Sequence, residues 1–178
     1  LIFLILLGGL FMATAQDAQE ILIKMDETLY SPKDMQSKTK IVLIDKSNNE
    51  KTREATMMQK GLDKRITRFT SPSSQAGIAV LSLPDDVMYL YMPAFGKERR
   101  IAAHVKNQKF AGTDFSYDDM EAIAYVDKYT GTLQKTENDH YLLALVPKSE
   151  KSEYSKVVMK VDKINYYPIF AEYYDKGN

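Results

Sequence analysis

The sequence contains no cysteine and only two histidines among its 178 residues. Without cysteine the chain forms no disulfide and has no thiol to carry a lipid after export. His104 and His140 fit neither the H-x-x-x-H nor the H-E-x-x-H spacing of a zinc site. A G-x-S-x-G elbow and a glycine-rich phosphate loop are also missing. We therefore predict no catalytic residues, no metal and no cofactor, and we expect that the protein is not an enzyme.

The chain also has no net charge, because 24 basic residues balance 24 acidic ones. A nucleic-acid-binding protein needs a basic field to engage phosphates. This balance excludes nucleic acid as the expected partner.

Long apolar runs are missing except at the N-terminus, where Leu1 to Met12 precede the small residues Ala13-Thr14-Ala15. This order is typical of a secretory signal peptide. The run is shorter than the roughly 20 residues of a bilayer span, although an N-terminal membrane anchor stays the alternative. We expect residues 1–15 to be an N-terminally truncated signal peptide. Residues 16–178 are expected to form a single periplasmic domain that is not itself lipidated.

The period of the apolar residues predicts one helix followed by many strands. Residues 17–30 have helical spacing, with Asp17 and Glu20 placed as a capping box. From there the period is two, and turn residues separate roughly nine strands. The expected strands include 64–72, 77–84, 87–93 and 99–106, and a short helix is expected before Tyr125. The pattern predicts an α+β, mainly antiparallel fold with a large, curved or partly closed sheet.

Several of these strands are apolar on both faces. In "VMYLYM", Met88, Leu90 and Met92 alternate with Val87 and two tyrosines. A sheet with one wet face alternates more cleanly, so both faces need cover. One face can pack on the helix, and the other can line an apolar cavity for which the adaptable methionine side chain is suited. An ordinary two-layer core is the alternative interpretation.

Acids and aromatic residues gather in "KFAGTDFSYDDME", residues 109–121. Closely spaced carboxylates can bind calcium, but the D-x-D-x-D-G spacing is absent. The interpretation that we prefer is structural: Asp114 or Ser116 caps a short helix whose first turn holds the other acids. Asp114 and Asp119 are also candidates to pair with nearby arginines.

The basic group "KERR" precedes this motif. Lys97, Arg99 and Arg100 could hold a lipid head group or contact a partner protein. A solvated strand is an equally good interpretation.

The segment from Leu90 to Glu121 resembles the outer-membrane lipoprotein-sorting protein family, relatives of the periplasmic carriers with the LolA/LolB-like fold. The family pattern is an aromatic strand end with Pro-Ala, then Arg-Arg-Ile, then Phe-x-Gly-Thr-Asp-Phe-Ser-Tyr-Asp-Asp. The matching residues are Tyr91, Pro93, Ala94, Arg99, Arg100, Ile101, Phe110, Gly112, Thr113, Asp114, Phe115, Ser116, Tyr117, Asp118 and Asp119. Tyr89 stands where members often have tryptophan.

The resemblance implies a half-open β-barrel whose concave apolar face is covered by helices and takes up acyl chains. Family members continue beyond the position of Asn178, so we expect C-terminal strands to be missing from this chain. The expected cavity residues are Met88, Leu90, Met92, Leu81, Phe110, Phe115 and Tyr117. Pro93, Gly112, Thr113, Asp114 and Asp119 are expected to be structural.

The expected function is that of a monomeric periplasmic carrier, which binds acyl chains of lipoproteins or lipids and moves them toward the outer membrane. An inner-membrane exporter and an outer-membrane acceptor are its expected partners. The alternative is a docking or accessory module for an exporter or assembly complex, with lipid binding incidental.

Overall fold

The computed structural model describes residues 6–177, with side chains from residue 17 onward. The chain divides into two compact units. Among the described residues, unit 1 contains 6–31 and 124–177, and unit 2 contains 32–123. Each unit has a core of its own.

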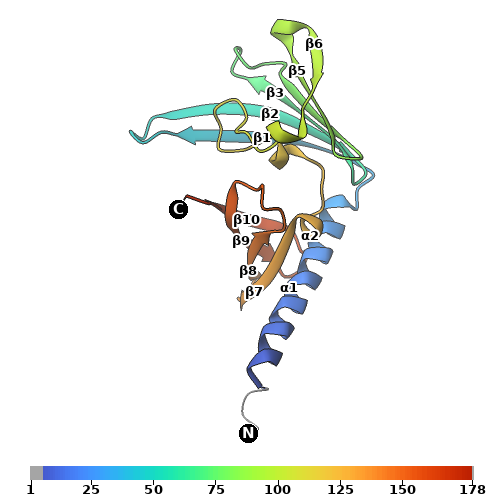
Figure 1. Cartoon of the computed structure of the whole chain (residues 1–178), viewed down its shortest axis with the longest axis vertical. Helices are drawn as coiled ribbons and strands as arrows, with labels where there is room; N and C mark the ends of the chain where they lie inside the picture. The colour runs from blue at the N-terminus through green and yellow to red at the C-terminus, as the bar shows by residue number, and fades with distance from the viewer. Residues whose placement is uncertain (1–5, 178) are drawn as a thin grey trace. The chain divides into compact units, whose positions relative to one another are not determined.

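Unit 1 combines two helices with a four-stranded antiparallel sheet (Figure 1). The helices are α1 (Leu6–Tyr30) and the single turn α2 (Tyr125–Lys128). The sheet has the strand order β10-β9-β8-β7. Its strands are β7 (Tyr129–Thr136), β8 (His140–Pro147), β9 (Tyr154–Asp162) and β10 (Pro168–Asp175).

The core of unit 1 lies between α1 and the sheet. Leu22 and Met25 recur at helical spacing and are fully buried against Leu143, Leu145 and Met159. Because strand side chains alternate between faces, one side of each strand supplies this core. The expected amphipathic helix is therefore confirmed as an element that covers a sheet.

A buried carboxylate joins the two helices of unit 1. Asp26 of α1 accepts hydrogen bonds from the backbone N–H groups of Tyr125 and Val126, at 2.9 and 2.8 Å. Those groups are unpaired donors at the start of α2, and Asp26 satisfies them from a distant part of the sequence. Burial raises the pKa of Asp26, while the two hydrogen bonds act in the opposite direction.

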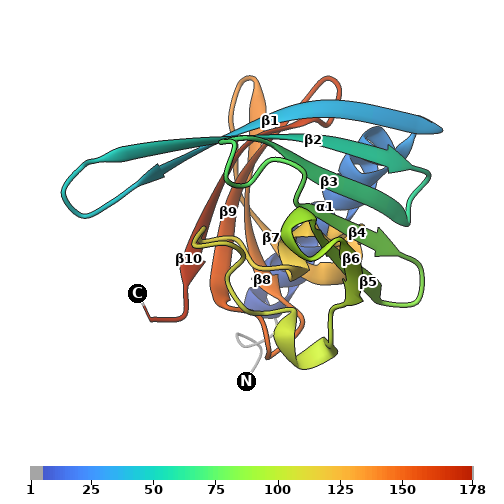
Figure 2. The same cartoon turned by 90° about the horizontal axis from the view of Figure 1, so that it is seen from above.

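Unit 2 is built on a six-stranded antiparallel sheet with the sequential order β1-β2-β3-β4-β5-β6 (Figure 2). The strands are β1 (Asp34–Ile44), β2 (Glu50–Lys60), β3 (Lys64–Ser71), β4 (Ala79–Leu83), β5 (Val87–Met92) and β6 (Lys97–Arg100). Three 3-10 turns follow the fifth strand: η1 (Pro93–Phe95), η2 (Ala103–Val105) and η3 (Asp118–Met120).

Residues 101–123 form an irregular segment, here named the covering segment, that packs on one face of this sheet. We call this face the covered face. It carries Phe69, Val80 and Met88, which form the core of unit 2 together with Ile101 and Phe110 of the segment. The registers place Leu90 with Val80 on this face and put Leu81 and Tyr89 on the opposite face.

The predicted α+β, mainly antiparallel class is confirmed. Turn residues separate neighbouring strands as expected, and the structure places three of these turns at 45–49, 84–86 and 137–139. Three local predictions were wrong. The strand expected at 99–106 ends at Arg100, because Ile101 and Lys106 turn down into the buried interior. The expected capping box is not at a helix start, since α1 already begins at Leu6, and Glu20 pairs instead with Lys24. The short helix before Tyr125 is reduced to η3.

Within residues 6–177, no helix combines the length and the apolar character needed to cross a membrane. Residues 1–5 of the expected signal peptide lie outside the described part of the chain.

At Gly131 of β7, helix α1 and the sheet of unit 1 approach each other closely. A Cβ atom added there would lie 3.1 Å from Leu22 Cδ1 and 3.3 Å from Ala18 Cβ. We expect Gly131→Ala to lower the free energy of unfolding by about 1–3 kcal/mol, because α1 must move away from the strand. Urea denaturation measures this change. Gly177→Ala is the control, since no heavy atom lies within 4 Å of the added methyl group. Equal stability of the two variants would contradict the prediction.

Candidate functional site: the covered face of the six-stranded sheet

The covering segment is anchored to the sheet at its centre by an aromatic cluster. Phe110 is 3% exposed, and its ring centroid lies 5.3 Å from that of Phe69 on β3. Tyr117 meets the other side of Phe110 edge-on, with centroids 5.2 Å apart. Tilted and edge-on aromatic pairs of this kind add to the free energy of apolar burial. Phe110 is thus the buried aromatic side chain that packs the covering segment onto the sheet.

A tight turn holds Phe110 in this position. Its backbone N–H donates to Phe115 O at 2.7 Å, and the buried Thr113 hydroxyl donates to Phe110 O at 2.7 Å. Ala111 and Gly112 have φ angles of +49° and +72°, which reverse the chain between these contacts. The φ angle of +72° at position 112 suits glycine, because glycine has no Cβ atom to cause strain there.

Asp119 stabilises the chain just after this turn, at Ser116. Its Oδ2 accepts hydrogen bonds from Ser116 N–H and from the Ser116 hydroxyl, at 2.8 and 2.9 Å. Asp114 pairs with Lys109 at 2.9 Å on the exposed side of the turn. The expected pairing of Asp114 with Arg99 or Arg100 is therefore wrong, because the turn brings a nearer cation to this acid. Asp118 and Asp119 lie in the first turn of η3 as expected, but the expected cap is wrong, because Tyr117 is the N-cap residue and no side chain caps this turn.

The two ends of the covering segment meet in a buried ion pair. Lys106 Nζ lies 2.9 Å from Glu121 Oε1, and both side chains are about 5% exposed. The same ammonium group donates to the backbone carbonyl of Asp86 and to its carboxylate, in the turn between β4 and β5. The pair thus fixes both ends of the segment to one hairpin of the sheet.

Neighbouring strands extend this polar network. Arg65 on β3 donates to the Glu121 backbone carbonyl at 3.0 Å and to Gln59 Oε1 at 2.9 Å. Ser82 on β4 accepts from the backbone N–H of Ala122 at 3.1 Å. Each buried polar group of this set has a partner, as burial requires.

The pKa values of the three ionisable groups in this network shift in different directions. Burial raises the pKa of Glu121 to about 6, although hydrogen bonding to Lys106 acts in the opposite direction. Burial would lower the pKa of Lys106, but its hydrogen bonds to Asp86 and Glu121 outweigh this and raise it. The hydrogen bond from Lys106 lowers the pKa of Asp86. Lys106 stays an ammonium, and Glu121 is the group that titrates near neutral pH.

An apolar cavity of about 170 Å³ lies between the covering segment and the strands β1 to β3. Its lining residues are Thr39, Ile41, Ala55, Met57, Arg65, Thr67, Phe69, Thr113, Phe115, Asp119 and Met120. Sheet and segment both contribute, so movement of the segment would change its volume.

Comparison with known proteins places this geometry in a family. A family model described as "Uncharacterized protein" matches residues 61–178. The chain belongs to that family. Among curated proteins, no significant match was found.

Solved structures define the fold more closely. An outer membrane lipoprotein-sorting protein domain from Vibrio parahaemolyticus is 26% identical to this chain, with a TM-score of 0.76. The match covers 92% of this chain and 74% of the Vibrio chain. A DUF1329 family protein from Desulfovibrio piger is 28% identical with a TM-score of 0.75, over 92% and 75%. A LolA superfamily protein from Nitrosomonas europaea is 25% identical with a TM-score of 0.65, over 90% and 73%.

The resemblance to outer-membrane lipoprotein-sorting proteins is therefore confirmed, and the chain has the open-barrel fold type of the LolA superfamily. At the coarse level this fold indicates a protein of the lipid-carrier or lipoprotein-carrier type.

The structure brings most of the expected cavity residues onto the covered face. Met88 is fully buried, and Leu90 and Tyr117 pack beside it in the core of unit 2. Phe115 lines the cavity and is 40% exposed. Met92, two residues beyond Leu90, points to the same face. Leu81 is separated from them, because it lies opposite Tyr89 on the other face.

The three basic candidates lie on β6, where every side chain is exposed. The Arg99 guanidinium lies 4.9 Å from the centre of the Phe95 ring. Pro93 begins η1 and approaches Gly77 so closely that a Cβ on Gly77 would lie 2.8 Å from Pro93 Cγ.

Sequence reasoning missed the buried ion pair and one further cation. Lys106 and Glu121 are 15 residues apart, a spacing that indicates no contact by itself. Arg53 on β2 has a buried Nη1 atom without an acceptor among the described residues, and its Nη2 lies beside Gly112. A buried donor of this kind is one that would be satisfied by donating to a carbonyl oxygen. Among the residues that the structure describes, no group of three acidic or histidine side chains could hold a metal ion.

Glu121 makes the stability of unit 2 depend on pH. Its pKa rises from 4.5 to about 6 on folding, so the folded protein binds more protons between these values. The contribution of the Glu121 proton to the free energy of unfolding is fully present below the pKa of the unfolded state. It is lost as the pH rises through the higher pKa of the folded state, and the loss is about 2 kcal/mol. We expect Glu121→Gln to remove this loss, so that the free energy of unfolding of the variant does not fall across this pH window.

Urea denaturation of wild type and Glu121→Gln across this pH window tests the prediction. Glu50→Gln, which changes an exposed acid on β2, is the matched control and should follow the wild type. Parallel stability curves for wild type and Glu121→Gln would contradict the assignment.

Proposed function

We propose that the protein is a periplasmic carrier that binds acyl chains of lipoproteins or lipids on the covered face and moves them toward the outer membrane. The observation that carries this proposal is the apolar cavity between the covering segment and β1 to β3, in a chain with the LolA-type fold. Residues 16–178 would act as one carrier domain after removal of residues 1–15 as a signal peptide.

The size of the cavity defines how such a carrier would work. At about 170 Å³ it is smaller than the roughly 300–1,000 Å³ of ordinary ligand pockets. An acyl chain would therefore enter by displacing the cavity-lining side chains Phe115 and Met120, while Phe110 and the Lys106–Glu121 pair hold the segment. Each buried CH₂ contributes about 0.8 kcal/mol, enough for one chain to drive this opening.

The polar surroundings of the cavity suit the head of such a ligand. The unsatisfied Arg53 Nη1 could donate to the carbonyl at the start of an acyl chain. Met57 and Met120 would adapt to chains of different shape, because methionine has several rotatable bonds and a polarizable sulfur atom. Release would follow when the side chains of Phe115 and Met120 return to the cavity.

Filling the cavity should prevent uptake. Ala55 is 2% exposed and lines the cavity from β2. We expect Ala55→Leu to lower the affinity for a dansyl-labelled fatty acid at least about tenfold, because the added carbons occupy the space for the chain. Fluorescence titration measures the affinity, and thermal unfolding confirms that the variant is folded.

Ala171→Leu is the control, since it adds the same atoms to an exposed position of β10. Unchanged affinity in a folded Ala55→Leu protein would remove the cavity from the proposal. Native mass spectrometry of the protein purified from its own periplasm then identifies the cargo. A bound mass of a lipid or an acylated peptide is expected.

The exposed strand β6 favours a second role, as the surface that docks on an exporter or acceptor. It is an edge strand, so one side of its backbone is free to pair, and Lys97, Arg99 and Arg100 are all exposed. We expect Lys97→Ala/Arg99→Ala/Arg100→Ala to weaken cargo transfer to anionic membrane vesicles or to an acceptor while leaving fatty-acid affinity unchanged. Equal loss of both would show that these residues serve the cargo site itself.

A further inference from the structure

The opposite face of the six-stranded sheet in unit 2 carries a groove that the carrier proposal does not use. Two adjoining hollows of about 560 and 350 Å³ share the side chains of Ile66 and Leu81. Both volumes fall in the range of ligand pockets, which is roughly 300–1,000 Å³. The hollows lie side by side across β1 to β6.

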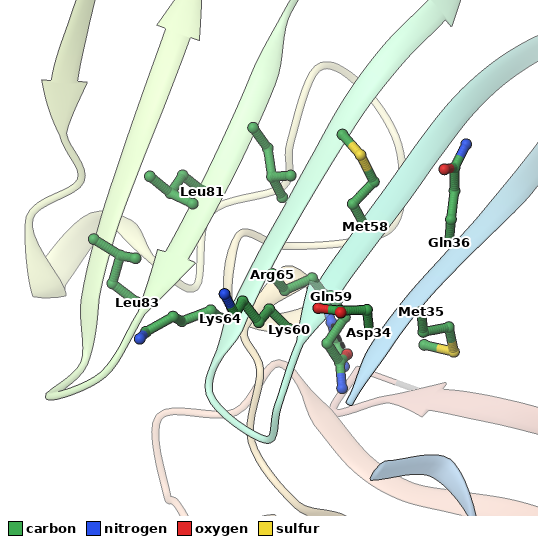
Figure 3. A pocket seen from close by; sticks show the side chains of 11 residues that line it. Asp34, Met35, Gln36, Met58, Gln59, Lys60, Lys64, Arg65, Leu81 and Leu83 are labelled. Carbon is green, nitrogen blue, oxygen red and sulfur yellow. Dashed lines mark hydrogen bonds between the residues drawn. The ribbon is translucent and has the colours of Figure 1, made fainter. Parts of the chain in front are cut away.

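The floor of this groove is apolar and continuous. Leu81 lies opposite Ile66 in one register and opposite Tyr89 in the other, so these three side chains form a row across β3, β4 and β5. Figure 3 shows Met58, Leu81 and Leu83 projecting from the same side of the sheet. With strands about 4.8 Å apart, the row from Met58 on β2 to Tyr89 on β5 is about 14 Å long, which suits an extended acyl chain of medium length.

A pair of lysines lies at one end of the groove. Lys60 and Lys64 are directly opposite each other beside the turn between β2 and β3, and both are exposed (Figure 3). Like charges opposite each other on neighbouring strands destabilise a sheet. Neither ammonium group has an ion pair or hydrogen bond to another described side chain. A bound anion would relieve this repulsion.

The remaining charges around the groove leave a cationic excess at this end. Asp34 lies opposite Lys60 on β1 without forming an ion pair, so that two lysines face one acid at this end. Arg68 and Glu98 line the other hollow, where their charges balance. The head group that fits the lysine end is therefore a single anion.

We infer that this groove binds a single-chain anionic amphiphile of the fatty-acid type, with its carboxylate at Lys60 and Lys64 and its chain over Ile66, Leu81 and Tyr89. The site is separate from the cavity of the covered face, since Leu81 and Tyr89 point away from Met88 and Leu90. It does not depend on the carrier function.

Fluorescence titration with dansyl-undecanoate, below its micelle concentration, tests the inference. Wild type should bind two molecules per chain, one of them weakened by added salt because its head group is held by exposed charges. Lys60→Glu/Lys64→Glu should lower the affinity of the salt-sensitive site about tenfold or more. Lys46→Glu/Lys51→Glu, which makes the same charge change at the far β1–β2 hairpin, should leave it unchanged.

The head-group assignment is tested with the methyl ester of the same probe. Weaker binding of the ester to the salt-sensitive site supports the inference, and equal binding of acid and ester overturns it. Leu81→Gln should weaken both probes at this site. Should that variant fail to fold, Met58→Gln is used, since Met58 is 40% exposed.

The two proposals fail in distinguishable ways. If only the groove exists, wild type binds one probe molecule and Lys60→Glu/Lys64→Glu abolishes this binding. If only the covered cavity exists, the lysine variant binds normally and Ala55→Leu does not bind, which overturns the groove. Binding of anionic vesicles through Lys60 and Lys64 without binding of the monomeric probe also overturns it, in favour of a membrane-docking face.

Discussion

The buried contact between Lys106 and Glu121 determines where the rest of unit 2 can lie. It joins the two ends of a long segment without regular strands and holds them to the hairpin of β4 and β5 through Asp86. Breaking a buried ion pair leaves an uncompensated charge, which costs about 3–5 kcal/mol. With both ends fixed, the segment can extend Phe110 onto Phe69, and the space that remains beside this contact is the candidate cavity.

This arrangement separates two tasks within one segment. The anchors are polar and directional, so they define one position of the segment on the sheet. The surface between the anchors is apolar and includes Phe115 and Met120, whose contacts have little directional preference. A segment with fixed ends and an adaptable middle can accommodate a ligand without leaving the sheet. The Glu121 carboxyl also gives the anchor a protonation state that changes near neutral pH.

Much of the fold was predictable from the sequence because strand periodicity and turn residues act locally. The hairpin around Asn48 and the strand Val87–Met92 follow directly from alternation and turn composition. The tight turn around Gly112 and Thr113 was identified through the resemblance, and its hydrogen bonds account for the motif. The strand expected at 99–106 was wrong beyond Arg100. Ile101 and Val105 suggest alternation, but Ile101 is buried in the core of unit 2, and Val105 ends the 3-10 turn η2 and packs against that core.

The long-range contacts of the site were beyond sequence reasoning. Lys106 meets acids 15 and 20 residues away, and Asp26 meets Tyr125 at a separation of 99 residues. No local pattern encodes such separations. The same limit applied to Leu81, whose face depends on the register with β5 and not on its apolar character. Two apolar faces were expected from composition, but only the register shows which residues share each one.

The division of unit 1 into two distant stretches of chain has a consequence for biogenesis. Helix α1 emerges first, yet β7, β8 and β9, which bury Leu22 and Met25, follow only after the whole of unit 2 has been made. Contacts across such a separation form late, because the loop between them must first be closed. The apolar side of α1 is thus made before unit 2 and buried only after it, which leaves this side accessible to a chaperone while residues 32–123 are synthesised.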